Sequence, residues 1–284
     1  MTVTLNIAGI AFYLEIPQAL FQPIAHHFSF FEEPQGSSAE AYFHVEVTKD
    51  VPVIDGSEST PKFHAVSPTA FVYGCTTFVF TIDTERSSGQ LLLSARLVDP
   101  FAEIFSTFKW FFVFMVIARK GIPLHSSSII MDKKAYLFSG ASGKGKSTIC
   151  GLLSSHLQKC RNGSDELNVI FAAGNDLYTY STPFHSSNGA GVIRERVSLA
   201  SVFFIEHCSS NKIEYAERTY AFRNLLQNVY HVPANREVMN LLVDSVCFLS
   251  EFPIYYSFFF INQPSVAECF NTFRSEINAH QVIG

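Results

Sequence analysis

One short stretch of the chain has the residue types and the spacing of a phosphate-binding loop. It fits the pattern G-x-x-x-x-G-K-[S/T] in full, with Gly140, Ala141, Ser142, Gly143, Lys144, Gly145, Lys146, Ser147 and Thr148. Small residues let consecutive backbone N–H groups curl around a polyphosphate, and the helix that follows adds the positive end of its dipole. In this pattern Lys146 neutralises β- and γ-phosphate oxygens, and the Ser147 hydroxyl binds Mg²⁺. We therefore predict a nucleotide-binding loop here.

An acidic pair and a histidine lie on either side of this loop in the sequence. Asp165 and Glu166 follow the helix that is expected after the loop, at what we predict to be the start of a strand. Two carboxylates that face a phosphate-binding loop can hold Mg²⁺ and accept a proton from an attacking hydroxyl. His125 follows a turn that contains proline. It is either a core or capping residue, or it assists proton transfer beside the acidic pair.

Four arginines are candidates for neutralising the charge of a transferred phosphoryl group, as such reactions favour. They are Arg194, Arg196, Arg218 and Arg223. For each of them taken singly, an ordinary surface role is the simpler interpretation.

Apolar runs predict the elements that must position these residues. Ala135–Phe138 predicts a strand that leads into the loop, and residues 148–157 predict the helix that leaves it. Ser126–Met131 predicts a second strand, and only the polar link 132–134 separates it from the first. So short a link makes a hairpin, which joins antiparallel strands. In common P-loop NTPases this strand lies in a parallel sheet, so we expect a fold unlike that of small GTPases. Asn175–Asp176 predicts another hairpin turn rather than part of a site.

The rest of the chain predicts two domains. Residues 1–98 have short strand-like segments and form a β-rich module, in which Thr2–Ile10 predicts a strand and residues 70–98 predict one long hairpin. Asp99-Pro100 then begins a helix over residues 99–120 with a broad apolar face, which we interpret as a buried helix that bridges two layers. The second domain, residues 99–284, starts with this helix and carries the loop.

Composition excludes several classes of protein. The net charge of −5 and the lack of any basic cluster argue against a nucleic-acid partner. The Phe-rich run 108–118 contains Lys109 and falls short of the ~20 apolar residues that a bilayer requires, which argues against a membrane protein. The first residues lack a secretory signal, and the six cysteines form no CxxC pair, so we predict a cytoplasmic protein with reduced thiols.

Residues 120–265 resemble the catalytic domain of HPr kinase/phosphorylase and its relatives, which share a fold with phosphoenolpyruvate carboxykinase. His125 precedes the loop as the family's histidine does, and the hairpin leads directly into it. Residues 164–167 resemble the family's Asp-Asp motif, and residues 181–185 (Ser-Thr-Pro-Phe-His) resemble a segment of related kinases that mature lasso-type peptides. The resemblance implies a mixed α+β P-loop kinase core.

The same resemblance implies roles for the candidate residues. Asp165 would be the catalytic base that polarises a serine hydroxyl, assisted by His125 and Lys146. Ser147, Asp165 and Glu166 would bind Mg²⁺, with Glu166 in place of the family's second aspartate. ATP and Mg²⁺ would be required.

The leading hypothesis is therefore an enzyme, an ATP- and Mg²⁺-dependent phosphotransferase. It would transfer the γ-phosphoryl group to a hydroxyl of a peptide, a small protein or an amino acid, and a serine hydroxyl is the acceptor that we expect. The alternative is a nucleotide-binding scaffold with little or no transfer, which would have no need of a carboxylate at Asp165. The charged fraction of 16% and the aromatic stretch 252–261 offer more apolar surface than one core needs, so we expect a homo-oligomer.

Overall fold

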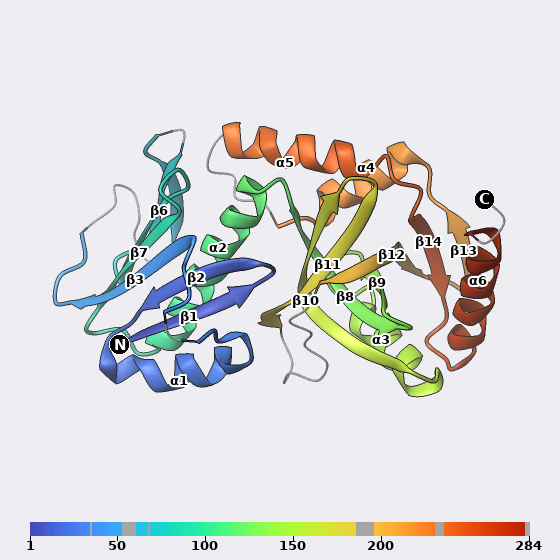
Figure 1. Cartoon of the computed structure of the whole chain (residues 1–284), viewed down its shortest axis with the longest axis horizontal. Coiled ribbons are helices and arrows are strands. Elements are labelled where there is room, and N and C mark those ends of the chain that lie inside the picture. Colours follow the sequence, from blue (N-terminus) through green and yellow to red (C-terminus); the bar gives the residue numbers. More distant parts are fainter. Residues whose placement is uncertain (35, 53–60, 68, 186–195, 231–235, 282–284) are drawn as a thin grey trace. The chain divides into compact units, whose positions relative to one another are not determined.

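The computed structural model describes most of the chain: residues 1–34, 36–52, 61–67, 69–185, 196–230 and 236–281. It contains two compact units. The first is Met1–Gly121 with His231–Val243, and the second is Ile122–Tyr230 with Asp244–Gly284. Each unit holds one seven-stranded sheet, and six α-helices lie within the described part of the chain (Figure 1). The fold class is mixed α/β.

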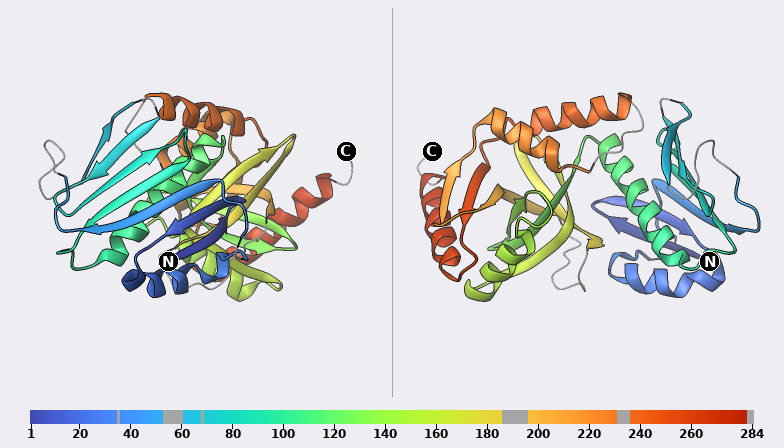
Figure 2. Two further views of the ribbon diagram at one scale, coloured as in Figure 1. Left: turned by 60° about the vertical axis from the view of Figure 1, so that its left-hand side comes forward. Right: turned by 180° about the vertical axis from the view of Figure 1, so that it is seen from behind.

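The first unit is a sheet with two helices packed against it. Its strands have the spatial order β1-β2-β3-β7-β6-β5-β4. The bounds are β1 Thr2–Ile7, β2 Ile10–Glu15, β3 Ala41–Thr48, β4 Lys62–Ala65, β5 Ala70–Gly74, β6 Phe78–Asp83 and β7 Ser88–Ser94. The pairings β2–β3 and β3–β7 are parallel and the others are antiparallel. The end of α1 (Gln18–Phe28) packs against the first turns of α2 (Pro100–Ala118), with the rings of Phe28 and Phe108 5.3 Å apart; Figure 2 shows both helices beside the sheet. A short 3₁₀ turn (Ser29–Phe31) follows α1.

Helix α2 forms the core of the first unit. Asp99 caps its N-terminus by accepting a backbone hydrogen bond at 3.1 Å, and Pro100 stands in the first turn, where its missing N–H costs nothing. Phe108 packs against Phe12 and Phe43 with ring centroids 5.3 and 5.2 Å apart. Within the described residues, α2 is the one helix long and apolar enough to cross a membrane, and 56% of its most apolar window is buried. Its apolar face is a core face, as the sequence predicts.

Two strand predictions for the first unit are wrong. Thr2–Ile10 is not one strand, because Ala8 and Gly9 have positive φ angles of 56° and 75° and turn the chain into a β1–β2 hairpin. The long hairpin predicted over residues 70–98 is a three-stranded meander, because residues 75–77 form a further turn between β5 and β6.

The grouping of helices also differs from the prediction. Helix α1 was not predicted, and Pro23 lies inside it. Helix α2 groups with the first unit, whereas the sequence predicts a boundary at residue 98 and assigns this helix to the second domain. The physical reason is the phenylalanine packing between α2 and the strands of the first sheet.

The second unit is a sheet with helices on both faces. Its strands have the order β11-β10-β8-β9-β12-β14-β13, and β11 also pairs with β12, so five strands close into a small barrel. The strands are β8 Ile122–Met131, β9 Lys134–Ser139, β10 Cys160–Ala173, β11 Asp176–His185, β12 Val197–His207, β13 Lys212–Tyr215 and β14 Tyr255–Phe260. The helices are α3 Lys146–His156, α4 Arg218–Asn228, α5 Arg236–Leu249, which spans both units, and α6 Ser265–Gln281.

The core of the second unit lies between the sheet and helices α3 and α6. Ile149 and Leu153 of α3 are fully buried, and so is Phe270 of α6. Phe203 of β12 stacks on Phe138 of β9 at 5.2 Å, within the same cluster. This packing fixes α3, and with it the loop that begins the helix, against the end of β9.

The hairpin before the loop forms as predicted, with one difference in its surroundings. β8 and β9 pair antiparallel, and the turn residues Asp132 and Lys133 have positive φ angles of 50° and 62°. On its other side, however, β9 pairs parallel with β12. β9 therefore lies in a mixed sheet, with one antiparallel and one parallel neighbour.

The aromatic stretch 252–261 provides an inner strand. β14 lies between β12 and β13, and Tyr255, Phe258 and Phe260 are buried. These side chains are part of the core, so they supply no free apolar surface for an oligomer.

Candidate active site

The loop between β9 and α3 turns at two glycines. β9 ends at Ser139 and α3 begins at Lys146, and between them Gly143 and Gly145 adopt positive φ angles of 80° and 87°. Gly145 also has no room for a side chain, because a Cβ there would lie 2.9 Å from Cζ of Phe260 and 3.2 Å from the ring of His207. Backbone N–H groups at the start of α3 are available to an anion.

Gly145→Ala is expected to prevent nucleotide binding. A left-handed conformation costs a non-glycine residue roughly 1–2 kcal/mol, and the added methyl overlaps Phe260. Calorimetric titration with Mg·ATP measures the loss. Gly151→Ala is the control, since its Cβ points into open space on α3 and should raise the free energy of unfolding by about 1 kcal/mol. Unchanged ATP affinity in Gly145→Ala would contradict the assignment of this loop.

Lys146 lies between the rim of the loop and the acidic pair. Its ammonium donates to the carbonyl oxygens of Gly140 at 2.8 Å and Ala141 at 3.2 Å, and the residue is only 8% exposed. Burial lowers the pKa of Lys146, and the carboxylates of Glu166 and Asp165 oppose that shift. The loop lysine and both predicted acids therefore share one electrostatic environment.

Asp165 meets the loop directly. The Ser147 hydroxyl lies 2.8 Å from Oδ1 and 3.0 Å from Oδ2 of this carboxylate and donates to it. A second hydroxyl, that of Ser127 on β8, also donates to Oδ1. Ser127 and Asp165 are cross-strand partners in the β8–β10 ladder, which sets this contact.

Glu166 turns to different partners. Its Oε1 accepts a hydrogen bond from the hydroxyl of Tyr230, and its Oε2 lies 3.7 Å from Nδ1 of His125. The same imidazole nitrogen lies 3.1 Å from the backbone oxygen of Glu166. His125 therefore lies beside the acidic pair, and its part in proton transfer stays a prediction.

The sequence predicts that the acidic pair begins a strand, and this is wrong: the pair lies within β10. β10 carries one extra residue between Asn162 and Asp165 relative to β8, and Glu166 has a φ of 120°. Successive side chains of a regular strand point to opposite faces. The bulge lies before the pair, and the irregularity within the pair is the positive φ of Glu166. Both carboxylates contribute to the electrostatic environment of Lys146.

A buried polar cluster supports the bulge. Asn168, 1% exposed, donates to the backbone oxygen of Ser126 at 2.8 Å and accepts from the Ser128 hydroxyl at 3.0 Å. The Ser128 hydroxyl also lies within hydrogen-bond distance of the backbone oxygen of Ser164. The Thr182 hydroxyl donates to the backbone oxygen of Leu167 at 2.7 Å. The irregular backbone around the acids is thus hydrogen-bonded by side chains. Sequence reasoning missed this cluster, although three consecutive serines inside an apolar strand are a signal.

Asn168→Ala is expected to lower the free energy of unfolding by about 1–3 kcal/mol, because buried groups of Ser126 and Ser128 lose their partners. Urea denaturation measures the change. Gln227→Ala, on the exposed side of α4, is the matched control and should stay within about 0.5 kcal/mol of the wild type. Equal stabilities of the two variants would contradict the supporting role of Asn168.

For two of the three candidate arginines that the structure describes, contacts with other residues are recorded. Arg218 forms an ion pair with Glu251 at 2.7 Å, and Arg196 lies 4.6 Å from the ring centre of Tyr178. Arg223 is exposed on α4, and Arg194 lies outside the described residues.

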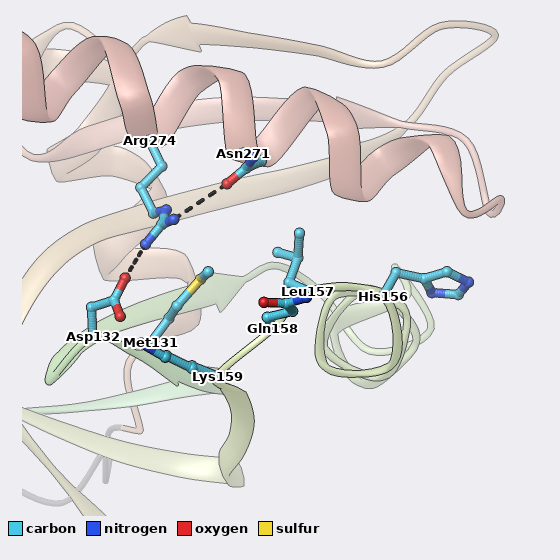
Figure 3. A pocket seen from close by; sticks show the side chains of 8 residues that line it. All are labelled: Met131, Asp132, His156, Leu157, Gln158, Lys159, Asn271 and Arg274. Carbon is cyan, nitrogen blue, oxygen red and sulfur yellow. Dashed lines mark hydrogen bonds and ion pairs between the residues drawn. The ribbon is translucent and has the colours of Figure 1, made fainter.

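A pocket of about 430 Å³ lies elsewhere in the second unit (Figure 3). It is at the opposite ends of β9 and α3 from the loop, where Arg274 of α6 pairs with Asp132 and lies 3.3 Å from the side-chain oxygen of Asn271. The pocket is lined by Met131, Asp132, His156, Leu157, Gln158, Lys159, Asn271 and Arg274. None of the predicted site residues lines it. Within the described residues, no group of three or more His, Cys, Asp or Glu is arranged to hold a metal.

Comparisons with known proteins add little to this geometry. No protein-family model matches the chain, and no curated protein matches it. Among solved structures, the chain is similar to the Hpr(Ser) kinase/phosphatase from Coxiella burnetii, with 11% identity and a TM-score of 0.33 over 55% of this chain and 98% of that one. At this TM-score the similarity carries no argument, so the proposals that follow rest on the residues themselves.

Proposed function

We propose that the protein binds a nucleoside triphosphate with Mg²⁺ and transfers its γ-phosphoryl group to a hydroxyl. One observation carries the proposal: the hydroxyl of Ser147 in the loop meets the carboxylate of Asp165 on β10 at 2.8 and 3.0 Å. In P-loop NTPases a loop serine or threonine and an aspartate from a nearby strand hold the metal ion.

The residues present fit both ATP and Mg²⁺. A hydroxyl and a carboxylate are oxygen ligands of the kind Mg²⁺ prefers, and Mg²⁺ usually takes only one or two protein ligands beside water and phosphate. Ser147 and Asp165 would hold the ion, which when bound neutralises charge on the β- and γ-phosphate oxygens. Lys146 adds a positive charge at the rim of the loop, and the N-terminus of α3 adds its dipole.

The geometry supports a division of roles between the two acids. Asp165 accepts hydrogen bonds from the hydroxyls of Ser147 and Ser127, and with Ser147 it would hold the metal ion. Glu166, beside His125, would face the acceptor, orient its hydroxyl and accept its proton. The resemblance implies the base to be Asp165; we propose Glu166 in that role.

A transfer screen tests the function. Purified protein is incubated with Mg·ATP labelled in the γ-phosphate and with serine-containing peptides, small proteins or free amino acids, while binding is measured separately by calorimetry. Labelled acceptor supports the proposed phosphotransferase. Tight binding of Mg·ATP without transfer to any acceptor or to water would favour the nucleotide-binding scaffold.

A further inference from the structure

Tyr230 reaches the candidate site from a distant part of the sequence. It follows α4, and its backbone N–H donates to the oxygen of Pro123 at 2.8 Å, next to a bridge between Val229 and Leu124. These contacts hold the residue against the start of β8 without using its side chain.

The side chain of Tyr230 contacts both Glu166 and His125. Its hydroxyl donates to Oε1 of Glu166 and lies 3.3 Å from Nδ1 of His125. Its ring stands edge-on to the imidazole, with centroids 5.8 Å apart and an angle of 88° between the planes. One phenol therefore restrains a carboxylate and an imidazole together.

Glu166 needs such a restraint more than a residue of regular strand does. Its φ of 120° lies outside the range of a regular strand, and the register of β10 against β11 shifts directly after it, so regular strand geometry does not fix the direction of its side chain. Burial, followed by the neighbouring Glu166, raises the pKa of Tyr230, so the phenol keeps its proton and remains a donor at neutral pH.

We propose that Tyr230 is a positioning residue, whose hydroxyl holds Glu166 and His125 in the orientation that receives the acceptor hydroxyl. The inference rests on the function proposed above. A tyrosine that only packed α4 against β8 would need its ring and its backbone, both of which phenylalanine keeps. The hydroxyl is the part that a purely structural role does not require.

Tyr230→Phe tests this role. Phosphate release from Mg·ATP, with water as the acceptor, is the assay, since it needs no identified acceptor. We expect kcat to fall roughly 10- to 100-fold, as when the partner of a site ligand is removed, with KM for ATP and the unfolding midpoint unchanged. Tyr220→Phe on α4 is the control, because its ring packs on Phe204 and the change removes a hydroxyl away from the site.

A double-mutant cycle shows whether Tyr230 acts through Glu166. If it does, Tyr230→Phe should cost little further activity in a Glu166→Gln background. If the fold-loss of activity in the double variant equals the product of the fold-losses in the two single variants, the two residues act independently and the inference is overturned. The ¹⁵N chemical shifts of the His125 imidazole give a readout without activity: they should change in Tyr230→Phe and not in Tyr220→Phe.

The outcomes separate this inference from the proposed function. An active wild type with unchanged kcat in Tyr230→Phe overturns the role of Tyr230 and leaves the function standing. A wild type that neither binds Mg·ATP nor releases phosphate overturns the function, and the positioning role with it. Unchanged His125 shifts overturn the contact itself, whatever the activity.

Discussion

Lys146→Ala is expected to abolish both the stabilisation by Mg·ATP and the phosphoryl transfer. A ligand at 100 times its Kd adds about 2.7 kcal/mol to the stability of a folded protein, which corresponds to a shift of several degrees in Tm. The variant should show no shift, because the loop loses its buried ammonium, and with it the positive charge that acts on Asp165 and Glu166. Differential scanning fluorimetry with and without Mg·ATP measures the effect.

Lys144→Ala is the matched control for this experiment. Lys144 belongs to the same loop but is exposed, whereas Lys146 is buried and donates to two loop carbonyls. The control should keep most of the ATP-dependent shift. A full shift in Lys146→Ala would remove the loop from the nucleotide site.

The second large effect separates the two acids. In Glu166→Gln we expect transfer to fall by ~10²–10⁴, the usual contribution of a general base, while the Mg²⁺ requirement stays unchanged. In Asp165→Asn we expect the Mg²⁺ concentration for half-maximal activity to rise roughly 10- to 100-fold, with partial recovery in excess Mg²⁺. Both substitutions keep the shape of the side chain and remove its charge.

A Mg²⁺ titration of activity in each variant distinguishes the roles. The reverse pattern, with normal Mg²⁺ dependence in Asp165→Asn and a shifted one in Glu166→Gln, would return the base to Asp165, as the family resemblance implies. Full activity in both variants would remove the acidic pair from the chemistry altogether.

Features that depend on neighbouring residues were predictable from the sequence. The strand before the loop, the helix after it and the turns at 132–133 and 174–175 follow from short runs of apolar, glycine and polar residues, and the structure contains them. The cap at Asp99 likewise needs only the residues that follow it. In each case the forces that decide the conformation act within a few residues.

Features that depend on distant contacts were not predictable. Tyr230 reaches Glu166 because its backbone is attached to the start of β8, and nothing near it in the sequence indicates that. The bulge in β10 needs Asn168 and the serines of β8, which lie on the other side of α3 in the sequence. Helix α1 contains Pro23, and its packing against α2 outweighs the local signal.

The bulge in β10 makes the site depend on a count of residues as well as on their types. Loss of one residue between Asn162 and Asp165 would shift the register of β10 against β8 by one residue, and such a slip turns side chains to the opposite face of the sheet, away from their present partners. Every residue of the motifs would still be present in such a chain. In genome surveys, relatives of this protein should therefore be aligned for insertions and deletions across this strand before any of them is counted as active. A motif inventory alone would not separate working copies from degenerate ones.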